Sequence, residues 1–327
     1  MVAVAASAGG VEALTGFVAT LPADFPAAVL VVLHIPPTGV SVLPAILDRA
    51  GKLPARHPRD GEPLTGGAIL VAPPDRHLAV DGHHARVLAG PAENGHRPAA
   101  DVLLRSVAES FGPRSAGVVL SGTMDDGAAG LGAVGTVGGL TLVQDPGEAA
   151  FPHMPQAAIQ VADPQVVAPA TELATYLTEW LAGLPPDPPE ADMSTPQPEP
   201  SADAEVTPLT CPDCGGTLWL HDEYGAERFR CRVGHTFSAD SLLIGQQAVL
   251  ERTLWAAVVA LEERADMSRR ILKRMTGQAR AGQLERYQQD IDDAERQAHY
   301  LRDLIRELLR PVSPSYHGEG TDVDPAS

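Results

Sequence analysis

The first 184 residues of the chain alternate short apolar runs with stretches of helical periodicity. The apolar runs are rich in valine and leucine and predict β-strands at 2–6, 28–34, 68–72, 77–81, 86–89, 116–121 and 139–144. Helices are expected over 11–20, 40–50, 99–111, 127–137 and 170–183. Because most runs lack polar alternation, their strands are expected to be buried on both faces. Repeated strand–helix–strand units predict an α/β domain over residues 1–184 with a doubly wound, mostly parallel sheet.

The pattern changes after this domain. Residues 185–209 are rich in proline and acidic side chains and have few large apolar ones, which predicts an extended linker without a core. Residues 210–240 contain all three cysteines of the chain. From 241 to 311, apolar residues recur every three or four positions, which predicts a helical hairpin or a coiled coil, formed within one chain or between chains. The polar residues 312–327 are expected to be a disordered tail.

Composition narrows the classes of function. The 327-residue chain has a formal net charge of −18, which argues against binding to nucleic acid or to anionic lipid, because both attract basic surfaces. No apolar run reaches the roughly 18 residues of a membrane-spanning helix, and no basic segment precedes the N-terminal apolar run as in a secretory signal. Three cysteines do not make a disulfide framework. We therefore expect a cytoplasmic protein without membrane insertion.

Polar residues follow three of the predicted strands at their carboxyl ends. Ser7 comes after the first strand, His34 closes the second, and Asp126 lies shortly after the strand at 116–121. The carboxyl ends of parallel strands meet at one edge of a sheet, where ligands bind. A hydroxyl nucleophile, an imidazole base and a carboxylate that orients the base could converge at this edge.

Each of these residues also has an ordinary structural explanation. Ser7 stands at a strand–helix corner, where it could cap the helix or belong to a phosphate-binding loop. His34 could be a strand-end histidine without a role, and Asp126 could cap the following helix. Asp125 is adjacent, and spacing alone does not choose between the two aspartates. The order Ser…His…Asp and the lack of a Gly-x-Ser-x-Gly turn argue against an ordinary lipase-type esterase.

Six segments occur in a fixed order along the first domain. They are Ser-Ala-Gly-Gly at 7–10, Leu-His-Ile-Pro-Pro at 33–37, Ala-Pro-Pro-Asp-Arg-His-Leu at 72–78, Ser-Gly-Thr-Met-Asp-Asp-Gly-Ala at 121–128, Gln-Asp-Pro at 144–146 and Phe-Pro-His-Met-Pro-Gln-Ala-Ala-Ile at 151–159. Over roughly residues 2–184, this set resembles the catalytic domain of the chemotaxis protein-glutamate methylesterase (CheB) family. The resemblance implies a three-layer α/β fold and serine-hydrolase chemistry that needs no catalytic cofactor.

The same resemblance implies hydrolysis of glutamate γ-methyl esters on chemoreceptors, with deamidation of certain receptor glutamines at the same site. By position, it makes Ser7 the nucleophile, His34 the base and Asp126 the carboxylate that orients His34. Residues expected around the oxyanion hole and the substrate cleft are Ala8, Thr123, Met124 and Met154.

Family members in flagellar chemotaxis carry an N-terminal receiver domain that covers the active site until it is phosphorylated. This sequence begins at the first predicted strand, so we expect a receiver-less form controlled by a partner or by the C-terminal region. The expected partner is a methylated chemoreceptor-type protein, together with a partner methyltransferase or another signalling protein. A second hypothesis is a scaffold of a chemotaxis-like system that binds a receptor or methyltransferase without turnover.

The cysteines occur in a spacing typical of metal ligands. Cys211 and Cys214 form a C-x2-C pair, and Cys231 and His235 form a C-x3-H pair after sixteen intervening residues. Three thiolates and an imidazole suit a closed tetrahedral Zn²⁺ site, so residues 210–240 are expected to form a small zinc ribbon around structural zinc. His221 is a competing ligand with poorer spacing.

Zinc ribbons often bind nucleic acid, so the surface chemistry of this segment matters. A basic strip of Arg228, Arg230 and Arg232 keeps the nucleic-acid alternative open. The acidity of the rest of the chain favours protein contact or scaffolding instead.

Overall fold

The computed structural model describes residues 1–184, 205–275 and 281–308. The chain divides into two compact units, the first ending at Gln246 and the second beginning at Gln247. The first unit contains the α/β domain and the segment with the cysteines. Within the described ranges, no helix combines the length and the apolar character needed to cross a bilayer.

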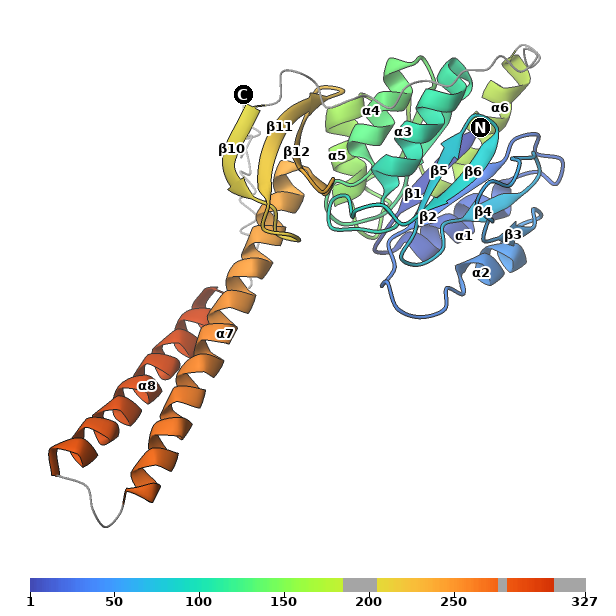
Figure 1. Ribbon diagram of the computed structural model, residues 1–327. Coiled ribbons are helices and arrows are strands. Elements are labelled where there is room, and N and C mark those ends of the chain that lie inside the picture. The colour runs from blue at the N-terminus through green and yellow to red at the C-terminus, as the bar shows by residue number, and fades with distance from the viewer. Residues whose placement is uncertain (185–204, 276–280, 309–327) are drawn as a thin grey trace, which may run out of the picture. The chain divides into compact units, whose positions relative to one another are not determined.

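A seven-stranded sheet forms the middle of the α/β domain (Figure 1). In spatial order its strands are β3 (Ala55–Arg56), β4 (Ile69–Val71), β2 (Val29–Leu33), β1 (Val2–Ala6), β7 (Ala116–Val119), β8 (Leu140–Gln144) and β9 (Val166–Ala168). Every neighbouring pair is parallel, which confirms the predicted sheet. The winding reverses at β1, between β2 and β7, and ligands of such sheets bind at the carboxyl edge of the switch point.

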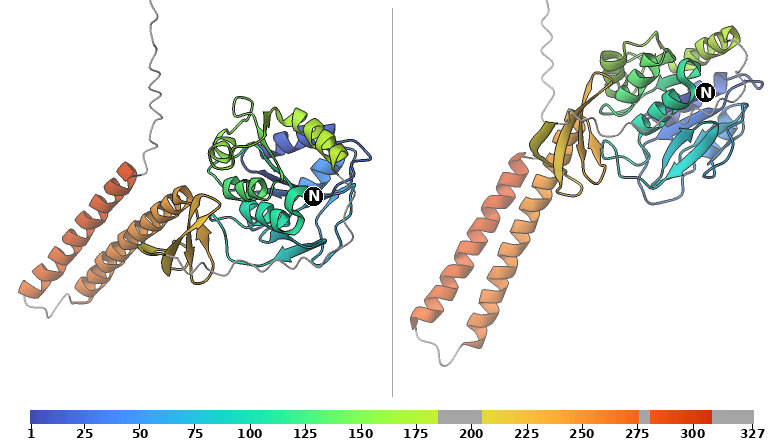
Figure 2. Two further views of the ribbon diagram at one scale, coloured as in Figure 1. Left: turned by 90° about the horizontal axis from the view of Figure 1, so that it is seen from above. Right: turned by 45° about the horizontal axis from the view of Figure 1, so that its top comes forward.

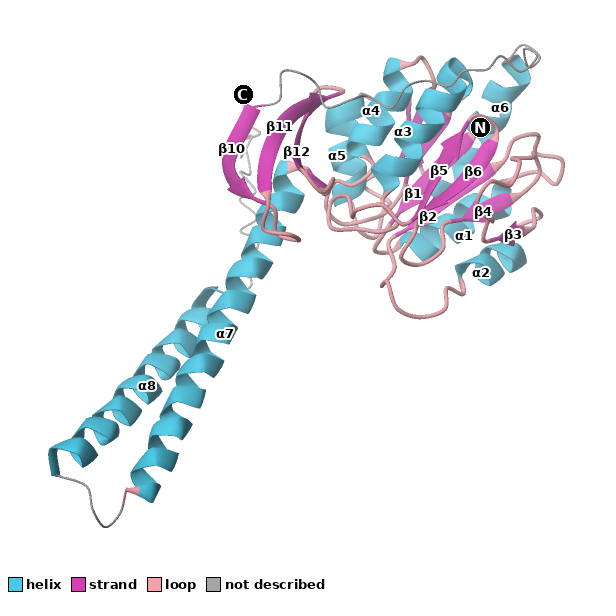
Figure 3. Ribbon diagram, viewed as in Figure 1, coloured by secondary structure: helices cyan, strands magenta, loops and turns pink. Residues whose placement is uncertain are grey.

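Helices cover both faces of this sheet and complete three layers (Figure 3). One face packs on α1 (Gly10–Thr20), α2 (Leu43–Ala50) and α6 (Ala170–Gly183). The other packs on α3 (Ala100–Phe111), α4 (Ala128–Thr136), α5 (His153–Ala162) and an antiparallel hairpin of β5 (His77–Asp81) and β6 (His84–Leu88). Because both faces are covered, all five residues of β1 are buried and apolar, as the lack of polar alternation predicts.

Three elements were not anticipated from the sequence. The strands β3 and β9 are only two and three residues long and lie at the two edges of the sheet. Helix α5 contains Pro155 near its start, and proline is tolerated in a first helical turn because the amide it lacks has no partner there. Helix α2 begins at Leu43, three residues later than predicted.

The cysteine-bearing segment is a four-stranded antiparallel sheet, which we call the ribbon (residues 205–238). Its strands are β10 (Glu205–Thr210), β11 (Thr217–Glu223), β12 (Ala226–Cys231) and β13 (Thr236–Phe237). Residues 205–209, assigned to the linker from composition, belong to β10, because Val206 pairs with Trp219 of β11. The rest of the predicted linker lies outside the described residues.

Two long helices follow the ribbon, α7 (Ala239–Arg274) and α8 (Ala281–Leu308) (Figure 2). In the second unit they pack on each other through Val258 of α7 and Ala298 and Ile305 of α8, all buried. The spacing of apolar residues therefore builds a hairpin within one chain. The predicted tail lies beyond the described residues.

Candidate active site

Ser7 and His34 follow adjacent strands at the carboxyl edge of the sheet. β1 and β2 pair in parallel with Ala6 opposite Leu33, so Ser7 and His34 occupy the next step of the same register. The His34 amide continues the ladder by donating to the Ala6 carbonyl at 3.2 Å. The backbones of the two residues are thus about one strand spacing (~4.8 Å) apart.

Asp126 is 1% exposed and joins His34 to the start of α3. Its Oδ2 accepts hydrogen bonds from His34 Nε2 and from the Ala100 amide, both at 2.6 Å. Its Oδ1 accepts from Asn94 Nδ2 at 2.9 Å and from the Asp101 amide at 3.1 Å. Burial alone would raise the pKa of Asp126, but the hydrogen bond and charge of His34 outweigh burial and lower this pKa. The carboxylate is therefore an ionised acceptor with four donors.

The tautomer of His34 follows from this arrangement. An ionised carboxylate can only accept, so His34 Nε2 carries a hydrogen, and in the neutral ring Nδ1 is the nitrogen with the free lone pair. Nδ1 is buried and has no hydrogen-bond partner among the described atoms. The ring stacks on His96, with centroids 3.8 Å apart and planes 9° apart. Burial, together with the repulsion that a protonated His34 would exert, lowers the pKa of His96 to about 4, so the stacked ring is neutral near pH 7.

The starts of α3 and α4 are capped reciprocally. Asp126, just before α4, satisfies the amides of Ala100 and Asp101 at the start of α3. Asp101 Oδ1 accepts from the amides of Gly127 at 3.0 Å and Gly130 at 2.7 Å at the start of α4. Each carboxylate thus satisfies amides that lack helical partners and lies at the positive end of a helix dipole.

Two loops beside Ser7 present backbone amides without internal partners. The amides of Ala8, Thr123 and Met124 have no hydrogen-bond acceptor within the described part of the chain. Met124 has a φ of 65°, a left-handed conformation that turns the loop sharply. Ser121 ties the two loops together, because its Oγ donates to the Ala8 carbonyl at 2.9 Å. These amides could stabilise an oxyanion at the Ser7 corner.

Met154 was expected to line the substrate cleft, but the structure places it in the hydrophobic core. It is 1% exposed, and its amide donates to the Gly122 carbonyl at 3.0 Å. A Cβ on Gly122 would lie 2.0 Å from Met154 Sδ and 2.9 Å from Ser7 Cβ. Met154 therefore packs against the loop that contains Gly122. Because glycine has no side chain, this loop can lie close to Ser7.

Gly122→Ala is expected to destabilise the fold by about 1–3 kcal/mol, because the added methyl group overpacks this contact. Urea denaturation followed by circular dichroism measures the change. Gly183→Ala is the matched control, since a Cβ there meets no atom within 4 Å. Equal stability of the two variants would contradict the tight contact at Gly122.

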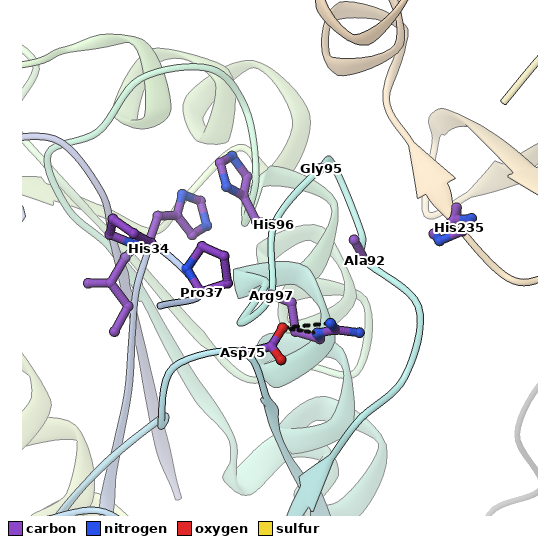
Figure 4. A pocket seen from close by; sticks show the side chains of 10 residues that line it. His34, Pro37, Asp75, Ala92, Gly95, His96, Arg97 and His235 are labelled. Carbon is purple, nitrogen blue, oxygen red and sulfur yellow. Dashed lines mark hydrogen bonds and ion pairs between the residues drawn. The ribbon is translucent and has the colours of Figure 1, made fainter. Parts of the chain in front are cut away.

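A pocket of about 490 Å³ opens beside His34 (Figure 4). His34 and His96 line one part of it, and the ribbon contributes His235. Arg97 and Asp75 also line it and are joined by a hydrogen bond of 2.9 Å from Arg97 Nε. Ser7 is not among the residues that line this pocket.

The four predicted metal ligands lie together in the ribbon. Cys211, Cys214, Cys231 and His235 each offer one atom, and these atoms all lie within 4.8 Å of one another. The Cys214 and Cys231 sulfurs are 3.6 Å apart, and His235 Nδ1 is 3.5 Å from Cys231 Sγ and 3.7 Å from Cys211 Sγ. His221 is not in the group.

Sequence reasoning missed several residues around Asp126. Asn94 and His96 lie in an irregular loop with no pattern that marks them. Asp101 did leave a signal, because it is a charged residue on the apolar face of a predicted helix. Arg228 was assigned to a basic surface strip, but it is buried and paired with Glu93 and Asp101 of the α/β domain, so it is not available to nucleic acid.

Comparisons with known proteins agree on the first domain. A family model described as CheB methylesterase matches residues 2–177. A protein-glutamate methylesterase/protein-glutamine glutaminase of Anaeromyxobacter dehalogenans is 42% identical over 183 residues, covering 55% of this chain and 54% of that protein. A protein of the same description from Myxococcus xanthus is 39% identical over 184 residues, which cover 56% of this chain and 52% of that protein. The chain thus spans about half the length of these curated relatives.

Among solved structures, the CheB methylesterase catalytic domain of Thermotoga maritima superposes with a TM-score of 0.52 at 30% sequence identity. The match covers 55% of this chain and 97% of that domain. The shared fold is the α/β domain that carries Ser7, His34 and Asp126.

Proposed function

Because this chain belongs to the CheB methylesterase family, we propose that it hydrolyses glutamate γ-methyl esters on a methylated chemoreceptor-type protein, with Ser7 as the nucleophile. The observation that carries the proposal is the 2.6 Å hydrogen bond from His34 Nε2 to the ionised Asp126, one register step from Ser7. It leaves His34 Nδ1 without a hydrogen-bond partner among the described residues, at the strand edge that holds the hydroxyl, so the neutral ring can act there as the base.

In the acylation step, Ser7 Oγ attacks the ester carbonyl carbon while His34 Nδ1 accepts the hydroxyl proton. Asp126 stabilises the imidazolium that forms. The carbonyl oxygen becomes an oxyanion, which we expect the amides of Ala8, Thr123 and Met124 to stabilise. The tetrahedral intermediate collapses, the C–O bond to the methoxy group breaks, and His34 gives its proton to the departing methoxy oxygen, which leaves as methanol. The glutamyl group remains esterified to Ser7.

In the second half-reaction, His34 takes a proton from water, and the resulting hydroxide attacks the acyl-enzyme carbonyl. The bond to Ser7 Oγ breaks, Ser7 recovers the proton from His34, and the product is glutamate. A glutamine side chain in the same position would release ammonia in place of methanol. The proposal therefore includes receptor glutamine deamidation, as in the names of the relatives.

The proposed compartment is the cytoplasm. The three described cysteines are free thiols gathered in a metal-binding group, an arrangement that a reducing compartment favours. A receptor tail and a partner methyltransferase or other signalling protein are the proposed partners in that compartment.

Methanol release and active-serine labelling together test the proposal. The full chain is incubated with a methylated receptor fragment, methanol is quantified, and a fluorophosphonate label is mapped by mass spectrometry. We expect methanol release, a label on Ser7, and loss of release in proportion to labelling. Release that persists after complete labelling of Ser7 would disprove the assigned nucleophile. Receptor binding without methanol release or labelling would favour a non-catalytic scaffold.

We also propose that Cys211, Cys214, Cys231 and His235 hold a structural Zn²⁺. Tetrahedral coordination with Zn–S bonds of 2.3 Å and Zn–N bonds near 2.0–2.1 Å places two sulfurs about 3.8 Å apart, and a sulfur and a nitrogen about 3.6 Å apart. The separations of 3.6 Å between the Cys214 and Cys231 sulfurs and of 3.5 and 3.7 Å from His235 Nδ1 to the Cys231 and Cys211 sulfurs fit these values, and all six separations are within 4.8 Å. Asp213 Oδ2 lies 3.9 Å from His235 Nε2, where it can orient the imidazole.

Replacing His235 with alanine is expected to weaken zinc binding by more than the ~10–100-fold typical of an outer-shell partner, because it removes a direct ligand. Competition with a chromogenic chelator, calibrated by elemental analysis, measures the affinity. The matched control is His221→Ala, which alters the other histidine of the ribbon and is expected to keep one zinc per chain. Equal zinc affinities in the two variants would contradict the assigned ligand set.

A further inference from the structure

Arg228 of the ribbon is buried against the α/β domain. Arg228 is only 2% exposed, although arginine is usually a surface residue, and it lies on β12 between Glu227 and Phe229. One guanidinium nitrogen, Nη2, donates to Glu93 Oε1 at 2.7 Å and to Asp101 Oδ2 at 2.8 Å. A buried arginine that reaches two carboxylates of another domain is a docking contact and not a solvated surface charge.

The positive charge of Arg228 favours the ionised form of the two buried carboxylates that it binds. Glu93 also binds Arg105 through two hydrogen bonds of 3.0 and 2.9 Å. Burial opposes ionisation of Glu93, but the charges of Arg105 and Arg228 outweigh it and lower the pKa of Glu93 to about 2. Burial raises the pKa of Asp101, and Arg228 is the strongest influence acting against that rise. Arg228 is therefore the main countercharge of Asp101.

Asn94 connects this ion cluster to Asp126. Its Nδ2 donates to Asp101 Oδ2 at 3.0 Å and to Asp126 Oδ1 at 2.9 Å. The same Asp101 oxygen receives Arg228, so the guanidinium, the Asp101 carboxylate, the Asn94 amide and the Asp126 carboxylate form one continuous hydrogen-bonded chain. His34 is the next group, through Asp126 Oδ2.

The ribbon and the first turn of α7 hold Asn94 from a second side. The Asn94 amide donates to the Thr236 carbonyl at 2.7 Å, and Asn94 Oδ1 accepts from the Ser238 amide at 2.9 Å and from Ser241 Oγ at 3.2 Å. Asn94 is 3% exposed and has a left-handed φ of 52°. Both polar atoms of the Asn94 side chain are thus held in place. Oδ1 is held by Ser238 and Ser241, and Nδ2 is held by Asp101 and Asp126.

We propose that Arg228, supplied by the ribbon, is a positioning residue for the Ser7 esterase: by binding Asp101 and Glu93 it fixes Asn94 and Asp126, and through them the ring of His34. The proposal rests on the proposed function, since it assigns Arg228 to the same reaction. The ribbon is then an integral part of the active-site support.

Burial holds the pKa of Asp101 at about 7 even with Arg228 present, so loss of the Arg228 charge would raise this pKa further and protonate Asp101 near pH 7. A protonated Asp101 is a weaker acceptor for Asn94 Nδ2, which leaves Asn94 and its partner Asp126 less firmly held. A displacement of about 1 Å in a catalytic group can cost about 100-fold in rate. Arg228→Met is therefore expected to lower kcat about 10- to 100-fold with little change in KM. Arg228→Lys keeps the charge and is expected to recover most of this loss.

The test measures two quantities on the zinc-loaded full chain. One is the rate of Ser7 labelling by a fluorophosphonate, together with kcat and KM for ester hydrolysis. The other is the far-downfield proton NMR signal of the His34–Asp126 hydrogen bond, assigned with a His34→Gln variant. Arg232→Met is the matched control, because Arg232 is an exposed arginine of the same ribbon. Zinc content and melting temperature verify that each variant is folded.

We expect Arg228→Met to lose or broaden the downfield signal and to slow labelling, while Arg228→Lys and Arg232→Met remain near the wild type. A folded Arg228→Met protein with the wild-type signal and labelling rate overturns the proposal. If that variant does not fold, Arg228→Gln replaces it, and a Gln variant equal to the Lys variant in both measurements overturns the proposal. An inert Ser7 in the wild type contradicts the proposed function, whereas the NMR comparison still decides whether Arg228 positions His34.

Discussion

Ser7→Ala is expected to lower ester hydrolysis by roughly 10⁵- to 10⁶-fold, the loss typical of removing a serine nucleophile. Stability should change little, because the Ser7 hydroxyl makes no hydrogen bond within the described residues and alanine keeps the Cβ that contacts Gly122. The amides of Ala8, Thr123 and Met124 remain in place and should retain substrate binding.

Methanol release in a discontinuous assay measures the loss, and calorimetry checks the fold. Ser110→Ala is the matched control, since Ser110 lies near the far end of α3 and its hydroxyl donates to the Val80 carbonyl at 3.3 Å. Turnover within tenfold of the wild type in Ser7→Ala would disprove the acyl-enzyme route.

Asp126→Asn is expected to lower kcat by about 10⁴-fold, because the wrong tautomer of His34 is then favoured. All four hydrogen bonds to Asp126 come from donors, which are His34, Ala100, Asn94 and Asp101. The NH2 group of an asparagine can only donate, so it would face two of these donors without an acceptor between them. The variant should therefore also melt at a lower temperature, unlike Ser7→Ala.

Asp125→Asn provides the comparison, since it changes the adjacent residue in the same way. Asp125 accepts from Ser238 Oγ at 2.9 Å, and an amide oxygen can accept that bond as well. We expect turnover within a few-fold of the wild type. A larger loss in Asp125→Asn than in Asp126→Asn would reverse the assignment of the two aspartates.

Sequence patterns predicted the parts of the fold that depend on local periodicity. Valine-rich runs such as 29–33 specify strands buried on both faces, and the helices between them follow their apolar spacing. Helix α5 escaped this reasoning, because Pro155 interrupts the pattern and only three of its ten residues are buried. The edge strand β9 is too short to carry a periodicity.

The site shows where local reasoning ends. Strand-end positions predicted Ser7 and His34, but the choice of Asp126 over Asp125 depends on which carboxylate faces α3, and that is a tertiary contact. The pairing of Arg228 with Asp101 spans 127 residues of sequence. An alternating strand places Arg228 and Arg230 on one face, and only the packing of the ribbon buries the first of them.

The reciprocal capping of α3 and α4 has an evolutionary consequence. A descendant of this protein that stopped hydrolysing esters would still need Asp126 and Asp101 to stabilise both helix starts, so selection for folding alone would preserve them. Among the described residues, the side chain of Ser7 caps no helix and anchors no loop. The presence of Ser7 is therefore the feature that would distinguish a working esterase from a related protein whose domain only binds a partner. The presence of Asp126 would not distinguish them.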